Sequence, residues 1–173
     1  MGNLILRNSV RFLFLVLFQV LILNHLNLGG YTNPYFYIYF ILLLPFATPR
    51  WLLLILAFIL GLSIDIFTNT YGLNAAATLI MAFCRPYVIR IISREPEEAF
   101  GIQPSLWSEG FQWFTLYSLI LVLIHHIALF YLELFRFTEF FSTLLRVLTS
   151  TVFTMVLIFL SEMIFRARER TRK

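Results

Sequence analysis

Residues 51–67 read WLLLILAFILGLSIDIF, a continuous apolar run that carries one charged side chain, Asp65, near its end. Its apolar residues do not alternate with polar ones, which argues against a strand of a membrane barrel. In a bilayer the backbone N–H and C=O groups must be paired within helices or closed barrels. The run therefore predicts a helix that crosses a membrane.

Five further apolar runs lie along the chain, and one hydrophilic segment, 93–110, separates the fourth run from the fifth. We expect an all-α integral membrane bundle of about six helices, forming a single domain over residues 1–173. The expected spans are about 12–28, 34–47, 51–67, 73–92, 111–132 and 142–165. The second run is short and bracketed by prolines, and about 12 helical residues reach only about 18 Å across a core of about 30 Å. It is expected to borrow flanking residues, to thin the membrane or to be partly re-entrant.

The composition also favours a membrane protein, because 60% of the residues are hydrophobic and only 13% are charged. Soluble domains have about 45–50% and about 25%, respectively. The net charge of +4 does not indicate a nucleic-acid partner, since the basic residues sit at the ends of apolar runs. With six spans, all but two of the 13 Lys and Arg residues fall on the side of the termini. The excess of basic residues predicts that both termini are cytoplasmic.

Three residues of the third run share one helix face, because Ala57, Gly61 and Asp65 recur every four residues. Small side chains at this spacing allow another helix to approach closely, and Ala75 and Ala76 of the next run suit that contact. An ionisable side chain in a membrane costs about 2.5–3.5 kcal/mol, so Asp65 needs a specific explanation.

Two explanations for Asp65 remain open. Its carboxylate docks a partner or ligand, or it makes a structural hydrogen bond or ion pair inside the bundle. Simple depth estimates place His125 at a depth in the membrane similar to that of Asp65, and Arg146 near the outer boundary. These two residues are therefore the expected partners for an ion pair.

The other polar residues of the apolar runs do not indicate catalysis. His125 and His126 are adjacent and point about 100° apart on a helix, so they do not converge on one metal ion. The sequence contains no HExxH motif, no phosphate-binding loop and no nucleophile elbow. Arg85 is expected to extend along its helix to the cytoplasmic surface. We therefore expect no enzyme activity, no cofactor and no metal. Four tyrosines are expected near the outer interface: Tyr31, Tyr35, Tyr37 and Tyr71.

The segment GLSIDIF at 61–67, followed by GLNA at 72–75, resembles the rod shape-determining protein MreD family of bacteria. That family carries a Gly-Leu-x-x-Asp segment at the outer end of a helix, followed by a short turn with Gly and a helix start rich in small residues. The run from Asn33 to Phe46, with its Pro-Phe ending, also looks like the family's second helix. The resemblance adds Gly72 and Asn74 to the candidate partner or structural residues Ala57, Gly61 and Asp65.

This resemblance implies a non-catalytic scaffold of the cell-shape and peptidoglycan-elongation complex in the bacterial inner membrane. The implied partners are a periplasmic MreC-like protein, the RodA glycosyltransferase with a class B penicillin-binding protein, the MreB filament and membrane lipids. The family has been likened to the substrate-capture subunits of energy-coupling-factor vitamin transporters, and such a subunit is the alternative function. Those subunits show small residues at four-residue spacing in their first helix, whereas residues 12–19 here read FLFLVLFQ.

Overall fold

The computed structural model describes residues 2–26, 33–93, 103–134 and 140–170. Every regular element among these residues is a helix, as expected for an all-α bundle. The long helices are α1 (Gly2–Leu21), α3 (Arg50–Thr68), α4 (Leu73–Ile92), α5 (Phe111–Leu134) and α6 (Phe140–Arg170). The short ones are η1 (Leu23–His25), η2 (Phe36–Ile38) and α2 (Tyr39–Leu42).

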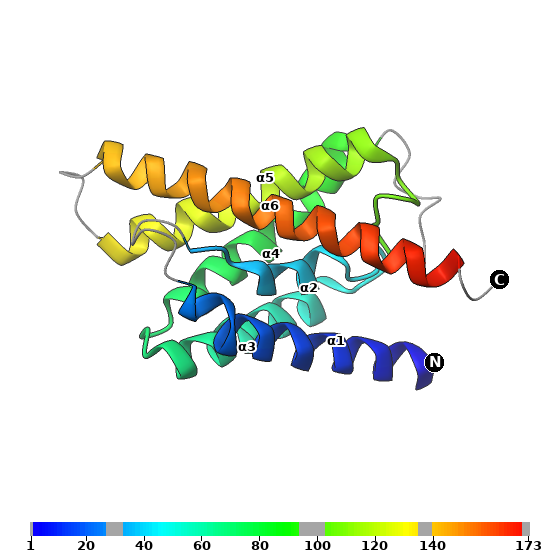
Figure 1. The fold of residues 1–173 in the computed structure, drawn as a ribbon, viewed down its shortest axis with the longest axis horizontal. Helices are drawn as coiled ribbons and strands as arrows, with labels where there is room; N and C mark the ends of the chain where they lie inside the picture. The colour runs from blue at the N-terminus through cyan, green and yellow to red at the C-terminus, as the bar shows by residue number, and fades with distance from the viewer. Residues whose placement is uncertain (1, 27–32, 94–102, 135–139, 171–173) are drawn as a thin grey trace.

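Five segments of the described chain are long and apolar enough to cross a membrane: Leu6–His25, Arg50–Thr68, Leu73–Ile92, Phe111–Glu133 and Phe140–Ile164. They match five of the six predicted spans, although the first begins earlier than position 12. In the bundle α3 packs on α4, α4 on α5 and α5 on α6, while α1 packs against α3 (Figure 1). The multi-pass helical architecture is thus present.

The predicted second span, 34–47, does not form a long helix. It consists of an extended start at 33–35, the 3-10 turn η2 and the four-residue helix α2. Pro45 explains the early end, because a proline disfavours the helical conformation of the residue before it. The prediction of a helical span over 34–47 is therefore wrong, because the α-helical part is only Tyr39–Leu42, which agrees with the expectation that this run is short.

The segment from η2 to α2 nevertheless passes through the middle of the bundle (Figure 1). Tyr37, Ile38, Ile41 and Leu42 are each 0% exposed, so this segment is the core around which the long helices pack. Figure 1 also places both chain termini at one end of the bundle and the turn between α3 and α4 at the opposite end. The two ends of the bundle are called below the terminal end and the turn end.

Side chains of the long helices satisfy the non-helical backbone at the start of the second segment. Gln19 of α1 donates from Nε2 to the carbonyl of Pro34 at 3.0 Å, and its Oε1 accepts from the N–H groups of Phe36 at 2.8 Å and Tyr37 at 3.3 Å. On the other side, Thr154 Oγ1 of α6 accepts from the N–H of Tyr35 at 3.1 Å. Irregular backbone survives at membrane depth only where protein groups pair it in this way.

The far end of the same segment is held by α4 and α5. Tyr117 donates its hydroxyl to the carbonyl of Leu42 at 3.0 Å, and Arg85 donates from its guanidinium to the carbonyl of Leu44. Arg85 Nε also donates to Tyr117 at 2.7 Å. Arg85 is only 2% exposed, so the prediction that it extends to the surface is wrong. The carbonyls at the end of α2 have no helical partner, and they explain why Arg85 is buried. A guanidinium offers several N–H donors in a fixed planar geometry.

Candidate functional site at the turn between α3 and α4

The carboxylate of Asp65 holds the start of α4. Its Oδ2 accepts from the backbone N–H of Ala75 at 2.8 Å, and its Oδ1 accepts from the backbone N–H of Asn74 at 3.0 Å. These N–H groups belong to the second and third residues of α4, which have no partner within a helix. A negative charge at this position also interacts favourably with the helix dipole. Asp65 therefore caps α4 from the preceding helix.

The same side chain and its backbone also close the turn. Thr70 donates its hydroxyl to Asp65 Oδ1 at 2.6 Å, and the Asn74 side chain donates to that oxygen at 3.0 Å. The carbonyl of Asp65 accepts from the N–H groups of Asn69 and Thr70. Asp65 is thus bonded to the turn and to α4, and not to His125 or Arg146. The expected ion pair with either residue is wrong, because local backbone donors occupy the carboxylate.

Gly61 is the point of closest approach between α3 and α4. A Cβ built on Gly61 would lie 2.5 Å from Ala75 Cα, 2.6 Å from the carbonyl oxygen of Asn74 and 2.7 Å from the N of Ala75. All three are backbone atoms, so no side-chain movement would relieve the overlap. Ala57 is 0% exposed one turn earlier. The predicted contact between small residues of the third run and Ala75 is confirmed.

Gly72 supplies the backbone conformation that starts α4. It is the N-cap residue with a φ of 87°, and a Cβ there would meet nothing within 4 Å. Glycine is favoured here by conformation, since a positive φ is costly for residues with a Cβ. Asn69 ends α3 with a φ of 54°, a conformation that asparagine tolerates.

Asn74 connects the turn to the core of the bundle. Its Oδ1 accepts from the hydroxyl of Tyr37 at 3.2 Å, and this hydroxyl lies 2.8 Å from Nε2 of His125 and 3.1 Å from Oγ1 of Thr78. We assign the proton of His125 to Nε2, because His125 then donates to Tyr37 and Tyr37 donates to Asn74. The sequence predicted that Tyr37 lies near the outer interface. This prediction is wrong, because Tyr37 lies at the centre of a buried network.

The second histidine of α5 belongs to a separate chain of hydrogen bonds. His126 Nδ1 lies 2.7 Å from the carbonyl of Val122, so it carries the proton, and Nε2 lies 3.4 Å from the hydroxyl of Thr154. That hydroxyl also accepts from the N–H of Tyr35. The histidines thus face different partners, and no group of three His, Cys, Asp or Glu residues in the described chain is placed to hold a metal.

Four of the five candidate residues come together at this one joint, which comprises Gly61, Asp65, Gly72 and Asn74, while Ala57 is buried on α3 one turn before Gly61. Beside it, three large side chains point outward: Ile66 is 67% exposed, Phe67 59% and Tyr71 fully exposed. The joint fixes the backbone from which these side chains project. It provides a stable, partly apolar surface at the turn end of the bundle.

Three other residues make contacts that the sequence did not predict. Gln19 and Arg85 satisfy the second segment, and Glu162 of α6 accepts from Tyr39 at 2.5 Å and from the N–H of Leu106 at 3.2 Å. The available signal was simple, because each is a polar residue within an apolar run.

No family model matches this chain, and no curated protein or solved structure is significantly similar to it.

Proposed function

We propose that this chain is a non-catalytic membrane scaffold of the bacterial cell-shape and peptidoglycan-elongation complex, similar to MreD. The observation that supports this proposal is the arrangement of the residues that carry the resemblance. Gly61 and Asp65 of one segment meet Asn74 and Ala75 of the other at a single backbone joint. A short motif in an apolar sequence thus has a definite structural task.

The proposed partner at the turn end is an MreC-like periplasmic protein. It would contact the surface formed by Ile66, Phe67 and Tyr71, because exposed aromatic and aliphatic side chains on a fixed backbone suit a protein contact. RodA with its class B penicillin-binding protein and the MreB filament would complete the complex. In this proposal the protein lies in the cytoplasmic membrane with both termini in the cytoplasm, as the distribution of basic residues favours.

The exposed face of α1 gives no support to a vitamin-capture function. Leu13, Phe14 and Leu17 project from it, with exposed fractions of 59%, 57% and 42%. Close docking of a coupling helix requires small residues instead. The bundle also buries Tyr37, Ile38 and Ile41 in its centre.

Depletion of the protein in its own bacterium tests the proposal. Cells should become round or lose control of their width, and re-expression of the wild-type chain should restore their shape. Uptake of radiolabelled vitamins should stay at the level of undepleted cells. Normal cell shape together with loss of uptake of one vitamin would refute the scaffold function and support the transporter alternative.

A further inference from the structure

A continuous chain of hydrogen bonds links the turn after α3 to the middle of α5. It begins at Oδ1 of Asp65, which accepts from Nδ2 of Asn74 at 3.0 Å. Oδ1 of Asn74 lies 3.2 Å from the hydroxyl of Tyr37, and that hydroxyl lies 2.8 Å from Nε2 of His125. All four side chains are buried, since the largest exposed fraction among them is 4%. The position of each proton in the chain is therefore set by the neighbouring side chains.

The carboxylate of Asp65 fixes the orientation of the Asn74 amide. Nδ2 of Asn74 faces two oxygens, Oδ1 of Asp65 and Oγ1 of Thr70, each at 3.0 Å. A rotated amide would place its carbonyl oxygen against the carboxylate, and two acceptors would then face each other without a proton between them. A hydrogen bond to an ionised group is also about twice as strong as one between neutral groups. Oδ1 of Asn74 is therefore held on the side of Tyr37.

Two acceptors then fix the proton of the Tyr37 hydroxyl. Oδ1 of Asn74 can only accept, and Oγ1 of Thr78, 3.1 Å from the hydroxyl, already donates to the carbonyl of Asn74 at 2.7 Å. Tyr37 must donate to one of these two oxygens, so its own oxygen is left to accept from His125. Nδ1 of His125 has no hydrogen-bond partner among the described residues, so a proton there would be an unpaired buried donor. Both ring nitrogens of His125 thus favour the proton on Nε2.

We infer that Asp65 controls which nitrogen of His125 carries the proton, so that the turn and α5 form one coupled unit. The carboxylate orients Asn74, Asn74 directs the hydroxyl of Tyr37, and Tyr37 selects the tautomer of the imidazole. Any event at the turn that separates Asn74 from the carboxylate would change the proton on His125. Asp65 is in this respect a positioning residue. The inference does not depend on the proposed cell-shape function, since it concerns hydrogen bonds within the chain alone.

Nitrogen NMR of the full chain with isotope-labelled histidine tests the inference, because the two ring nitrogens of a neutral imidazole are distinct. The chain has three histidines, and His25→Gln and His125→Gln identify the signals. The wild-type His125 ring should carry its proton on Nε2. His126 is an internal reference, because the carbonyl of Val122 at 2.7 Å holds its proton on Nδ1. A wild-type His125 ring with its proton on Nδ1 would overturn the inference.

Asp65→Asn tests the control by the carboxylate. It places an NH₂ group against the donors that the carboxylate accepts from, so Asn74 can rotate and Tyr37 can donate to His125. The population of His125 with its proton on Nδ1 should rise about tenfold, the equivalent of about 1.4 kcal/mol. Tyr37→Phe interrupts the chain of hydrogen bonds. In that background Asp65→Asn should cause no further change in the His125 signals.

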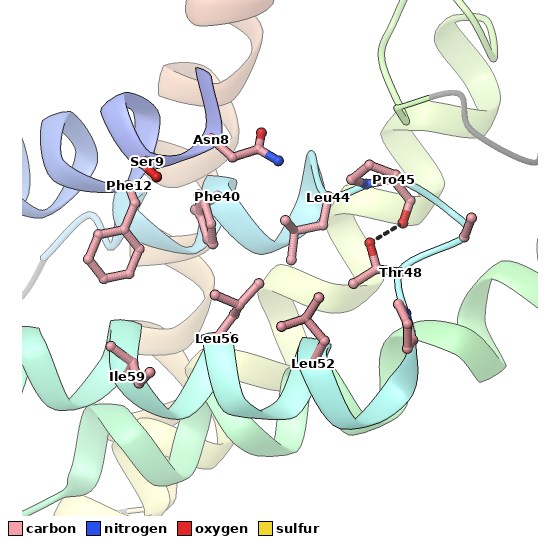
Figure 2. A pocket seen from close by; sticks show the side chains of 12 residues that line it. Asn8, Ser9, Phe12, Phe40, Leu44, Pro45, Thr48, Leu52, Leu56 and Ile59 are labelled. Carbon is pink, nitrogen blue, oxygen red and sulfur yellow. Dashed lines mark hydrogen bonds between the residues drawn. The ribbon is translucent and has the colours of Figure 1, made fainter. Parts of the chain in front are cut away.

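Two control variants keep the carboxylate of Asp65. Thr70→Ala removes another donor to its Oδ1, and Leu56→Ala shortens a side chain of α3 that points into the groove between α1 and α3 (Figure 2). Both should keep the His125 proton on Nε2, and unchanged His126 signals show that each variant is folded. An unchanged His125 signal in Asp65→Asn, or the same shift in either control, would overturn the inference. An equal response to Asp65→Asn with and without Tyr37→Phe would also overturn it.

Discussion

Asp65 Oδ2 accepts a hydrogen bond of 2.8 Å from the backbone N–H of Ala75, ten residues further along the chain. One turn before Asp65, Gly61 leaves room for the backbone of the same Ala75. The carboxylate and the missing side chain therefore act on one point of α4. This relationship explains an acidic residue that is only 4% exposed in an apolar helix, since its carboxylate supplies the acceptors that the N–H groups in the first turn of α4 lack.

Substitution of Asp65 should destabilise the protein by a moderate amount. Asp65→Asn removes one acceptor oxygen and the charge, and Asp65→Leu removes all the hydrogen bonds. We expect a loss of about 0.5–2 kcal/mol for Asn, as for other helix caps, and a larger loss for Leu. No large penalty for an isolated buried cation is expected, because Asp65 does not neutralise His125 or Arg146. Thermal unfolding in detergent measures the effect.

Ser63→Ala is a matched control for Asp65, because Ser63 donates only to the carbonyl of Ile59 in its own helix. It should change stability little. Equal stability of Asp65→Leu and Ser63→Ala would contradict the capping function of Asp65.

Alanine substitutions at two glycines should separate the effects of space and conformation. Gly61→Ala places a Cβ 2.5 Å from Ala75 Cα, so α3 and α4 must move apart, at a cost typical of overpacking, about 1–3 kcal/mol or more. Gly72→Ala meets no atom and costs only the positive φ, about 1–2 kcal/mol. Cysteine cross-linking between α3 and α4 should report a changed spacing for Gly61→Ala alone. The same cross-linking pattern in both variants would contradict this distinction.

The sequence predicts the long helices because hydrophobicity is a property of each run by itself. It also predicts the contact of Gly61 with Ala75, since both lie beside one short turn. It does not predict the partners of Asp65, because a distant cation and a nearby backbone N–H satisfy a buried carboxylate equally well. The burial of Arg85 could not be predicted either, because it depends on carbonyls at the end of α2 that are free only when that helix stops early.

Replacement of Gln19 should destabilise the crossing segment. Gln19→Met keeps the size of the side chain but leaves the N–H groups of Phe36 and Tyr37 and the carbonyl of Pro34 without their partner. A buried unpaired group costs about 1–3 kcal/mol, so the total loss should be at least about 3 kcal/mol. Leu17→Met on the exposed face of α1 is the control. Comparable denaturation midpoints for the two variants would show that Gln19 is not needed.

Lysine should not replace Arg85. A single ammonium group on a flexible stem does not reproduce the planar fork that reaches both Tyr117 and the carbonyl of Leu44. Arg85→Lys should lower the free energy of unfolding by about 1–3 kcal/mol. Arg90→Lys, at an exposed position of the same helix, should have little effect. If Arg85→Lys were as stable as Arg90→Lys, a surface position for residue 85 would be indicated, because lysine reaches the interface as well as arginine does.

Co-purification from cells in mild detergent, followed by mass spectrometry, tests the scaffold proposal most directly. The wild-type chain should capture an MreC-like protein and the enzymes of cell-wall elongation. The double variant Phe67→Ala/Tyr71→Ala should lose the MreC-like protein at unchanged thermal stability, because both side chains are exposed. The control Trp51→Ala/Ile91→Ala, which removes exposed side chains elsewhere on α3 and α4, should retain it. Capture of an ATPase with a coupling subunit in place of elongation proteins, or undiminished capture by the Phe67→Ala/Tyr71→Ala variant, would contradict the account.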